Sequence, residues 1–302
     1  MAKQGKVERK VKCTTRQGGF TLSFFSMAST CEILIDTDNK ALAKKLGLIA
    51  AKEAWRIEDK YSRYDQNSFC SKINTLAGET IAIDDETFKL FEFANQCFEM
   101  SDGGFDITSG ILRKAWCFDG SANVPAKADV DKLLKFVGWE KVSYSSKSFS
   151  MEKGMEIDFG GLGKEYAVDR TVLLLSQKAN VSFLVNYGGD LAVHGVKKNG
   201  EAWQVGIEHP SFNASKAPTV TLKSGAIATS GDANRFLLKD NHRYSHILNV
   251  KTGWPVEQPP NSITVAAPQC IQAGFLATLS LLKGVNAEKF LKDQNILYWS
   301  VR

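Results

Sequence analysis

Apolar residues recur along this chain with the period of a strand in some segments and of a helix in others. Phe20, Leu22 and Phe24 alternate with polar residues, which predicts two strands or a hairpin over residues 18–36. Over residues 41–63, leucine, isoleucine and alanine fall three or four positions apart between charged residues, as in an amphipathic helix.

A second helix is expected over residues 85–100, where apolar residues are frequent. The glycines of Ser101-Asp-Gly-Gly104 then suit its C-terminus. Strands and helices follow one another without a regular βαβ order, which favours an α+β fold with mixed, largely antiparallel sheets and packed helices. Further helices are predicted at 129–137, 164–178 and 272–283, and strands at 142–158, 182–186, 203–208, 219–223 and 263–266.

Composition limits the class of protein. The 302 residues, of which 43% are apolar, suffice for one large domain or two packed lobes, and no run of 18 apolar residues predicts a membrane span. Residues 1–16 hold six basic residues against Glu8, which already accounts for the net charge of +5. We therefore expect a flexible basic tail at 1–17, a single domain at 18–302, and no nucleic-acid or membrane partner.

The start of the chain has some features of a signal peptide, but polar residues interrupt its apolar stretch as they do in a strand. The six cysteines are scattered, with no CxxC pair, which argues against a zinc site and a disulfide framework. We expect buried, reduced thiols and a cytoplasmic protein.

The segment Asp158-Phe-Gly-Gly-Leu-Gly-Lys-Glu-Tyr-Ala-Val-Asp169 has three glycines within five positions, and a helix is predicted from Lys164. Glycine allows close approach to a ligand, and a helix N-terminus offers free N–H groups to a diphosphate. The segment matches neither common nucleotide fingerprint. From the residues alone, a phosphate cradle and a tight structural turn both remain open.

Similar glycine-acid clusters follow one another along the chain, and their order resembles that of the ApbE family, the FAD:protein FMN transferases. The segments that carry the resemblance are Met27-Ala-Ser29, Ser62 to Ser68, Gly104-Phe105-Asp106, Asp158 to Asp169, Gly188-Gly-Asp190, Thr229-Ser-Gly-Asp232, His246 to Pro255, and Ala273 to Thr278.

The resemblance implies an ApbE-like (T-fold-like) two-lobed architecture and a flavin transferase. Such an enzyme uses Mg²⁺ to split the diphosphate of FAD, attaches FMN to a threonine or serine hydroxyl of a target protein, and releases AMP. A convincing flavinylation motif is absent from this sequence, so the acceptor would be a separate protein. Mg²⁺ prefers hard oxygen ligands, and phosphoryl transfer needs charge stabilisation.

The resemblance also implies roles for particular residues. His246 would transfer a proton, because imidazole titrates near neutral pH. The metal would be held by the carbonyl of Gly161 and the hydroxyl of Thr278. FAD would be contacted by Met27, Tyr64, Gly104, Phe105, Asp106, Asp158, Lys164 and Ile247.

Each of these residues also has an ordinary structural interpretation. Met27 and Phe105 suit a core, Tyr64 the surface at a helix end, and Asp158 the cap of a turn. Lys164 suits a solvated helix face, a helical threonine such as Thr278 often bonds its own backbone, and a lone histidine such as His246 is usually structural.

The main departure from the family pattern is Gly274, where the family usually has a metal-binding aspartate one helical turn before Thr278. An acid elsewhere, such as Asp190 or Asp232, could replace it. Milder departures are Glu165 for a common glycine, Ala28 for glycine, Asn249 for aspartate and Val250 for proline. The alternative function is an FAD-binding or FAD-hydrolysing protein without transfer, which forms FMN and AMP only if it hydrolyses FAD.

Overall fold

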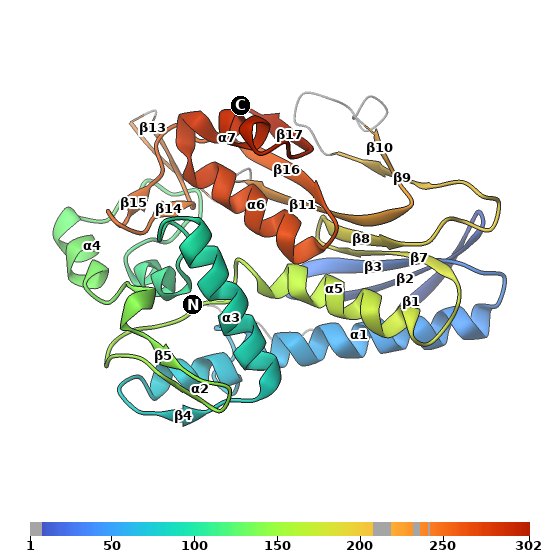
Figure 1. Ribbon diagram of the computed structural model, residues 1–302, viewed down its shortest axis with the longest axis horizontal. Helices are drawn as coiled ribbons and strands as arrows, with labels where there is room; N and C mark the ends of the chain where they lie inside the picture. The colour runs from blue at the N-terminus through green and yellow to red at the C-terminus, as the bar shows by residue number, and fades with distance from the viewer. Residues whose placement is uncertain (1–7, 208–218, 232–235, 241) are drawn as a thin grey trace. The chain divides into compact units, whose positions relative to one another are not determined.

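The computed structural model describes residues 8–207, 219–231, 236–240 and 242–302. The chain within these ranges forms two compact units (Figure 1), and each is described by itself. The first unit contains the described residues of 1–59, 162–229 and 264–274, and the second contains those of 60–161, 230–263 and 275–302.

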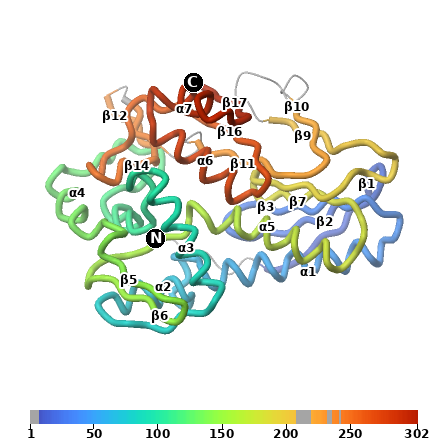
Figure 2. Tube along the Cα trace, viewed as in Figure 1, coloured from blue at the N-terminus to red at the C-terminus, as the bar shows by residue number. Residues whose placement is uncertain are grey.

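An antiparallel sheet dominates the first unit. The hairpin predicted over 18–36 is confirmed as β2 (Gly19–Ser26) and β3 (Ser29–Asp36), in which Phe24 lies opposite Cys31. Strand β3 pairs with β7 (Ser182–Tyr187), which turns directly into β8 (Asp190–His194). Figure 2 traces these neighbouring strands. After β8 the sheet continues with β11 (Ser224–Gly231) and β16 (Ser262–Ala267). A separate two-stranded sheet pairs β9 (Trp203–Gly206) with β10 (Thr219–Leu222).

The expectation of a flexible tail over 1–17 is wrong for its last part. Lys12–Arg16 forms strand β1 and pairs with β2 from Lys12–Ser23 to Arg16–Gly19. The alternation of Phe20, Leu22 and Phe24 predicts β2 but not β1. Strand β1 lies at the edge of the sheet and consists mostly of polar residues, so it shows no alternation of its own. Residues 1–7 lie outside the described part of the chain.

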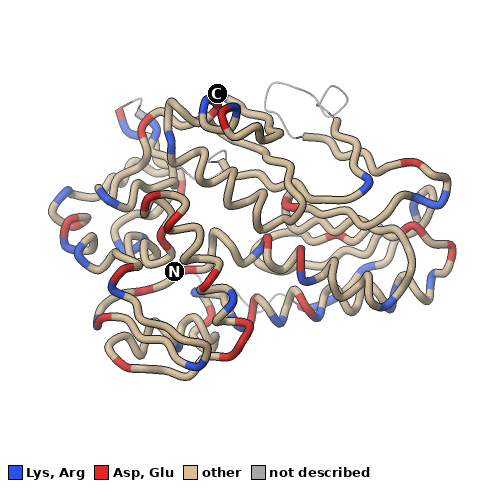
Figure 3. The backbone as a smooth tube through the Cα atoms, viewed as in Figure 1, with Lys and Arg blue, Asp and Glu red and all other residues tan. Residues whose placement is uncertain are grey.

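Two helices cover one face of this sheet, α1 (Lys40–Tyr61) and α5 (Gly163–Ser176), close to the bounds predicted from the sequence. The buried hydroxyl of Tyr187 on β7 lies 2.7 Å from Thr171 Oγ1 on α5 and 3.4 Å from the carbonyl of Ala50 on α1. Lys/Arg and Asp/Glu both occur along α1 (Figure 3), as expected for a helix with one solvated face. Helix α6 (Cys270–Leu282), predicted over 272–283, begins beside α5.

The second unit has an aromatic and aliphatic core around helix α3 (Asp85–Met100), whose bounds match the prediction. Phe91 on α3 stacks on Phe149 and Phe159, with ring centroids 4.4 and 5.6 Å away. A second cluster gathers around buried Trp116, whose indole donates to the carbonyl of Gly253 at 2.8 Å. The other helices are α2 (Phe69–Thr75), η1 (Ile107–Lys114), α4 (Lys127–Leu134), η2 (Trp139–Lys141), η4 (Gly284–Asn286) and α7 (Ala287–Asp293).

Short strands complete this unit, and they explain where the predictions were too long. Of the strands predicted over 142–158, only β5 (Ser143–Tyr144) and β6 (Ser148–Ser150) form. The turn expected at Lys153-Gly154 is present, but residues 155–158 after it are not a strand. The remaining strands are β4 (Ile81–Ala82), β12 (Phe236–Lys239), β13 (His242–Ser245), β14 (Leu248–Asn249), β15 (Trp254–Pro255) and β17 (Tyr298–Val301).

Together these elements confirm the predicted α+β class, since helices pack with mainly antiparallel strand pairs. None of the helices in the described ranges combines the length and the apolar character that a membrane span requires.

Candidate functional site

Asp158 ends the segment that leads to the glycine-rich turn, and two arginines of the second unit hold its carboxylate. Oδ2 lies 3.2 Å from Arg63 Nη1 and 3.3 Å from Arg113 Nη2, while Oδ1 accepts a hydrogen bond from Gly160 N at 2.9 Å. A Cβ on Gly110 would stand 2.6 Å from Asp158 Cβ, so the glycine permits this approach. Asp158 therefore caps its own turn and also belongs to a compact charged cluster.

Tyr64 belongs to the same cluster. It follows α1, its side chain is 78% exposed, and its hydroxyl accepts a hydrogen bond from Arg113 Nη1 at 2.5 Å. The guanidinium of Arg63 lies 5.9 Å from the centre of the Tyr64 ring. An exposed ring held by two arginines can stack against a planar ligand.

The Gly104-Phe105-Asp106 turn serves the second unit's own structure. Asp106 Oδ1 accepts hydrogen bonds from the backbone and hydroxyl of Thr108, both at 2.7 Å, and Oδ2 accepts one from Trp139 N at 2.9 Å. Burial raises the pKa of Asp106, and these bonds oppose the shift. Phe105 is buried, edge-on to Phe275, and packs beside the Cα of Gly161. Both oxygens of Asp106 thus have partners within the unit.

In the first unit, Lys164 pairs with a buried carboxylate. Lys164 lies in the first turn of α5, and its Nζ is 2.7 Å from Oδ2 of Asp190, whose side chain is only 3% exposed. Burial disfavours the charged lysine, but the charge of Asp190 outweighs this and raises the pKa of Lys164. Gly188 lies beside this pair, and a Cβ there would stand 2.7 Å from Ser29 Cβ and 3.7 Å from Lys164 Nζ. The lysine is therefore a fixed cation.

Met27 occupies the turn between β2 and β3. Met27 and Ala28 have φ values of 51° and 57°, a left-handed conformation that is unfavourable for residues with a Cβ. Glu58 stabilises the turn, because Oε1 accepts a hydrogen bond from Met27 N at 2.7 Å and Oε2 accepts one from Ser26 Oγ at 3.1 Å. The half-buried Met27 side chain thus stands on a turn that two hydrogen bonds to Glu58 hold.

Two of the departures from the family pattern meet in space. A Cβ on Gly274 of α6 would stand 2.7 Å from Cγ and 2.8 Å from Oε1 of Glu165 on α5. Oε2 of Glu165 is enclosed, and it has no hydrogen-bond partner among the described residues. Burial, reinforced by the negative charge of Asp190, raises the pKa of Glu165 to about 8.

Asp169, the last residue of the glycine-rich motif, joins the same two helices. One turn after Glu165 on α5, its carboxylate accepts hydrogen bonds from Cys270 N at 2.8 Å and Ile271 N at 2.9 Å. These N–H groups belong to the first turn of α6, where helices lack internal partners. The motif's aspartate is therefore a cap supplied by a neighbouring helix.

Replacing Asp169 by alanine is expected to lower the free energy of unfolding by about 2 kcal/mol, because two buried N–H groups lose a charged acceptor. Chemical denaturation of the Asp169→Ala variant measures this change. Asp169→Asn, which keeps one acceptor oxygen, should lose less. A loss below about 0.5 kcal/mol for Asp169→Ala would contradict the capping role.

Thr278, Ile247 and His246 lie in the second unit. Thr278 Oγ1 donates a hydrogen bond to Ser230 Oγ at 3.2 Å, and not to a backbone carbonyl of its own helix. Ile247 is buried, with its N–H donating to Ser245 Oγ at 3.1 Å. The half-buried ring of His246 lies edge-on to Phe118, with ring centroids 6.3 Å apart.

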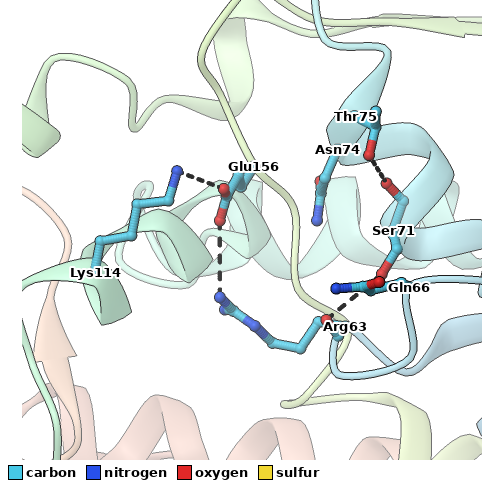
Figure 4. A pocket seen from close by; sticks show the side chains of 7 residues that line it. All are labelled: Arg63, Gln66, Ser71, Asn74, Thr75, Lys114 and Glu156. Atoms are coloured by element: carbon cyan, nitrogen blue, oxygen red, sulfur yellow. Dashed lines mark hydrogen bonds and ion pairs between the residues drawn. The ribbon is translucent and has the colours of Figure 1, made fainter. Parts of the chain in front are cut away.

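A polar cavity of about 590 Å³ also lies in the second unit (Figure 4). Glu156 in its lining bridges two cations, with Oε1 2.6 Å from Lys114 Nζ and Oε2 3.7 Å from Arg63 Nη2. None of the site residues predicted from the sequence lines it. Its lining consists of Arg63, Gln66, Ser71, Asn74, Thr75, Lys114 and Glu156.

The sequence model of the ApbE family matches residues 27–298, which is most of the chain. The chain belongs to the ApbE family. A curated ApbE relative, the FAD:protein FMN transferase of Vibrio cholerae, is 27% identical over 235 residues, covering 76% of this chain and 70% of the relative. The enzyme of that name from Klebsiella pneumoniae is 26% identical, covering 89% and 84%. The crystal structure of the ApbE protein of Thermotoga maritima superimposes with a TM-score of 0.81 at 29% identity, covering 93% of both chains.

Within each unit the structure groups some of the residues expected of an ApbE protein. Tyr64 and Asp158 meet through Arg63 and Arg113, and Phe105 packs beside Gly161. Neither arginine was predicted from the sequence. Arg63 lies inside the Ser62 to Ser68 segment, which was a usable signal, whereas no pattern marked Arg113. Among described residues, no three His, Cys, Asp or Glu gather as a metal cluster, and Asp232 lies outside those residues.

Proposed function

We propose that this chain transfers the FMN moiety of FAD to a threonine or serine hydroxyl of a separate acceptor protein, with Mg²⁺, and releases AMP. The observation that carries the proposal is the 158–164 segment, whose family-type acid and lysine are both held by charged partners. A fixed cation in the first turn of α5 suits a diphosphate, because the helix N-terminus also favours anions.

Each unit contributes residues in this proposal. In the first unit, Met27 contacts the flavin and Lys164 the diphosphate. In the second, the resemblance assigns Tyr64 and the Gly104-Phe105-Asp106 turn to the flavin, Asp158 to the nucleotide, and Ile247 to the lining. The exposed ring of Tyr64 supports stacking on the isoalloxazine, whereas Asp106 acts through the shape of its turn because its oxygens already have partners.

The chain offers oxygen donors that fit a Mg²⁺ ion. Gly161 is exposed, so its carbonyl is a candidate ligand, and the hydroxyl of Thr278 has only one weak protein partner among the described residues. The enclosed, unpartnered oxygen of Glu165 supports a cation near α5. When bound, Mg²⁺ would supply positive charge to the phosphoryl oxygens.

His246 is the proposed proton carrier. The acceptor hydroxyl oxygen forms a bond to the phosphorus of the FMN half, and the bond from that phosphorus to the AMP phosphate oxygen breaks. The hydroxyl proton has to leave in this exchange, and the imidazole of His246 accepts it. Lys164 remains protonated and holds the diphosphate in place.

The remaining parts of the proposal concern context. The chain from strand β1 onward acts as one ApbE-like domain, which the family match over 27–298 supports. The acceptor carries a flavinylation motif with a threonine or serine, and neither nucleic acid nor a membrane is a partner. A cytoplasmic location is supported by six free cysteines.

Purified protein incubated with FAD, Mg²⁺ and a flavinylatable partner domain tests the function. We expect AMP in solution and an FMN mass adduct on the domain, both abolished by EDTA. AMP without an adduct on any of several acceptor domains would instead favour hydrolysis of FAD, and intact FAD bound without either product would favour the binding protein. Gly274 is the residue that keeps these alternatives open, because it supplies no carboxylate.

A further inference from the structure

Helices α5 and α6 bring together the two residues that depart most from the family pattern. Where the family has glycine after the lysine this chain has Glu165, and where the family has a metal-binding aspartate it has Gly274. A Cβ on Gly274 would stand 2.7 Å from Glu165 Cγ and 3.0 Å from Cδ. The carboxylate of Glu165 therefore fills the space into which an aspartate at position 274 would project.

One oxygen of the Glu165 carboxylate has no partner in its described surroundings. Oε2 is enclosed and has no hydrogen-bond partner among the described residues. The neighbouring ammonium of Lys164 pairs with Asp190 at 2.7 Å, and the carboxylate of Asp169 is occupied by the N–H groups of α6. A buried carboxylate without a partner is costly unless a cation or a proton neutralises it.

We propose that Glu165 supplies, from α5, the metal-binding carboxylate that the family places at position 274 of α6. This inference rests on the proposed function, because it concerns the same Mg²⁺. Gly274 is then an adaptation that makes room for the longer side chain.

The capping contact supports this arrangement. Asp169 holds the first turn of α6, and Glu165 lies one turn back along α5, opposite a position one turn further along α6. The two helices therefore run in opposite directions with a fixed register here. This register places Glu165 opposite position 274.

Isothermal titration of the full chain with MgCl₂ alone tests the inference. We expect Glu165→Gln, which keeps the shape but not the charge, to weaken Mg²⁺ binding at least tenfold. The Glu165→Gly/Gly274→Asp double variant restores the family arrangement and should bind within about threefold of the native chain. Glu201→Gln, at an exposed loop position with the same change of charge, is the matched control and should bind like the native chain.

Unchanged Mg²⁺ affinity in Glu165→Gln would overturn the inference, as would a native chain that binds no Mg²⁺ at millimolar concentration while the double variant does. Thermal unfolding without metal checks folding, and Glu165→Gln should unfold near the native temperature because glutamine keeps the size of the glutamate side chain. The transfer assay separates the two proposals. If the native chain transfers FMN and Glu165→Gln binds Mg²⁺ as the native chain does, only the inference is refuted. If Mg²⁺ binding depends on Glu165 but the native chain transfers no FMN, only the proposed function is refuted.

Discussion

Replacing His246 by glutamine is expected to lower the rate of FMN transfer by about 10²–10⁴-fold, because glutamine cannot accept the proton of the acceptor hydroxyl. Glutamine preserves the bulk and polarity of the half-buried ring beside Phe118, so the free energy of unfolding should change by less than about 1 kcal/mol. Single-turnover measurements with saturating FAD and acceptor report the chemical step directly.

A structural role for His246 makes a different prediction. Free imidazole added to the His246→Ala variant should restore part of the transfer rate if the ring carries the proton, and should have no effect if the ring only packs. Binding of FAD, followed by flavin fluorescence, should change little in either variant. Native-like turnover of His246→Gln would exclude the proton-transfer role.

Replacing Lys164 by methionine is expected to have the largest effect on stability, a loss of about 2–3 kcal/mol. The variant leaves the buried carboxylate of Asp190, which is 3% exposed, without its cation. The value lies at the lower end for buried pairs because the Lys164 side chain is about one-third exposed. Urea denaturation at neutral pH measures the loss, and FAD affinity should fall as well.

The double variant Lys164→Met/Asp190→Leu should recover most of the lost stability but not the FAD affinity, because it removes the stranded charge without restoring the cation. Recovery of both would show that Lys164 has no part in binding. The pH dependence has a defined sign. Since the folded protein raises the pKa of Lys164 above 10.5, this stabilisation is complete below pH 10.5 and disappears as the pH rises through the folded-state value.

Much of the fold could be predicted because its strongest elements are locally encoded. Helix α3 matches its prediction at both ends, since Asp84 caps its first turn and Ser101 with the following glycines ends it. Strand β1 was not predicted, because its own residues show no alternation of apolar and polar positions. It becomes a strand by pairing with β2. Strands β8 and β11 were also missed, because the Gly188-Gly189 and Thr229-Ser-Gly motifs drew attention to turns rather than to the strands beside them.

The candidate site was predictable as a set of residues but not as a set of contacts. The order of motifs identified Asp158 and Lys164, yet their partners Arg113 and Asp190 are fixed only by tertiary structure. Asp169 belongs to the motif for a structural reason that no local pattern shows, because it caps a helix more than a hundred positions away. The contact between Glu165 and position 274 is of the same kind.

The close approach of position 274 to Glu165 also couples the changes at these two positions during divergence. An aspartate at 274 together with a glutamate at 165 would overlap, since even a Cβ comes within 2.7 Å of the glutamate. A chain with glycine at both positions would have neither of these two carboxylates at the contact. Either intermediate is disfavoured, so the exchange is epistatic. The loss of a signature residue at one position therefore does not establish a loss of activity when the residue that faces it has changed as well.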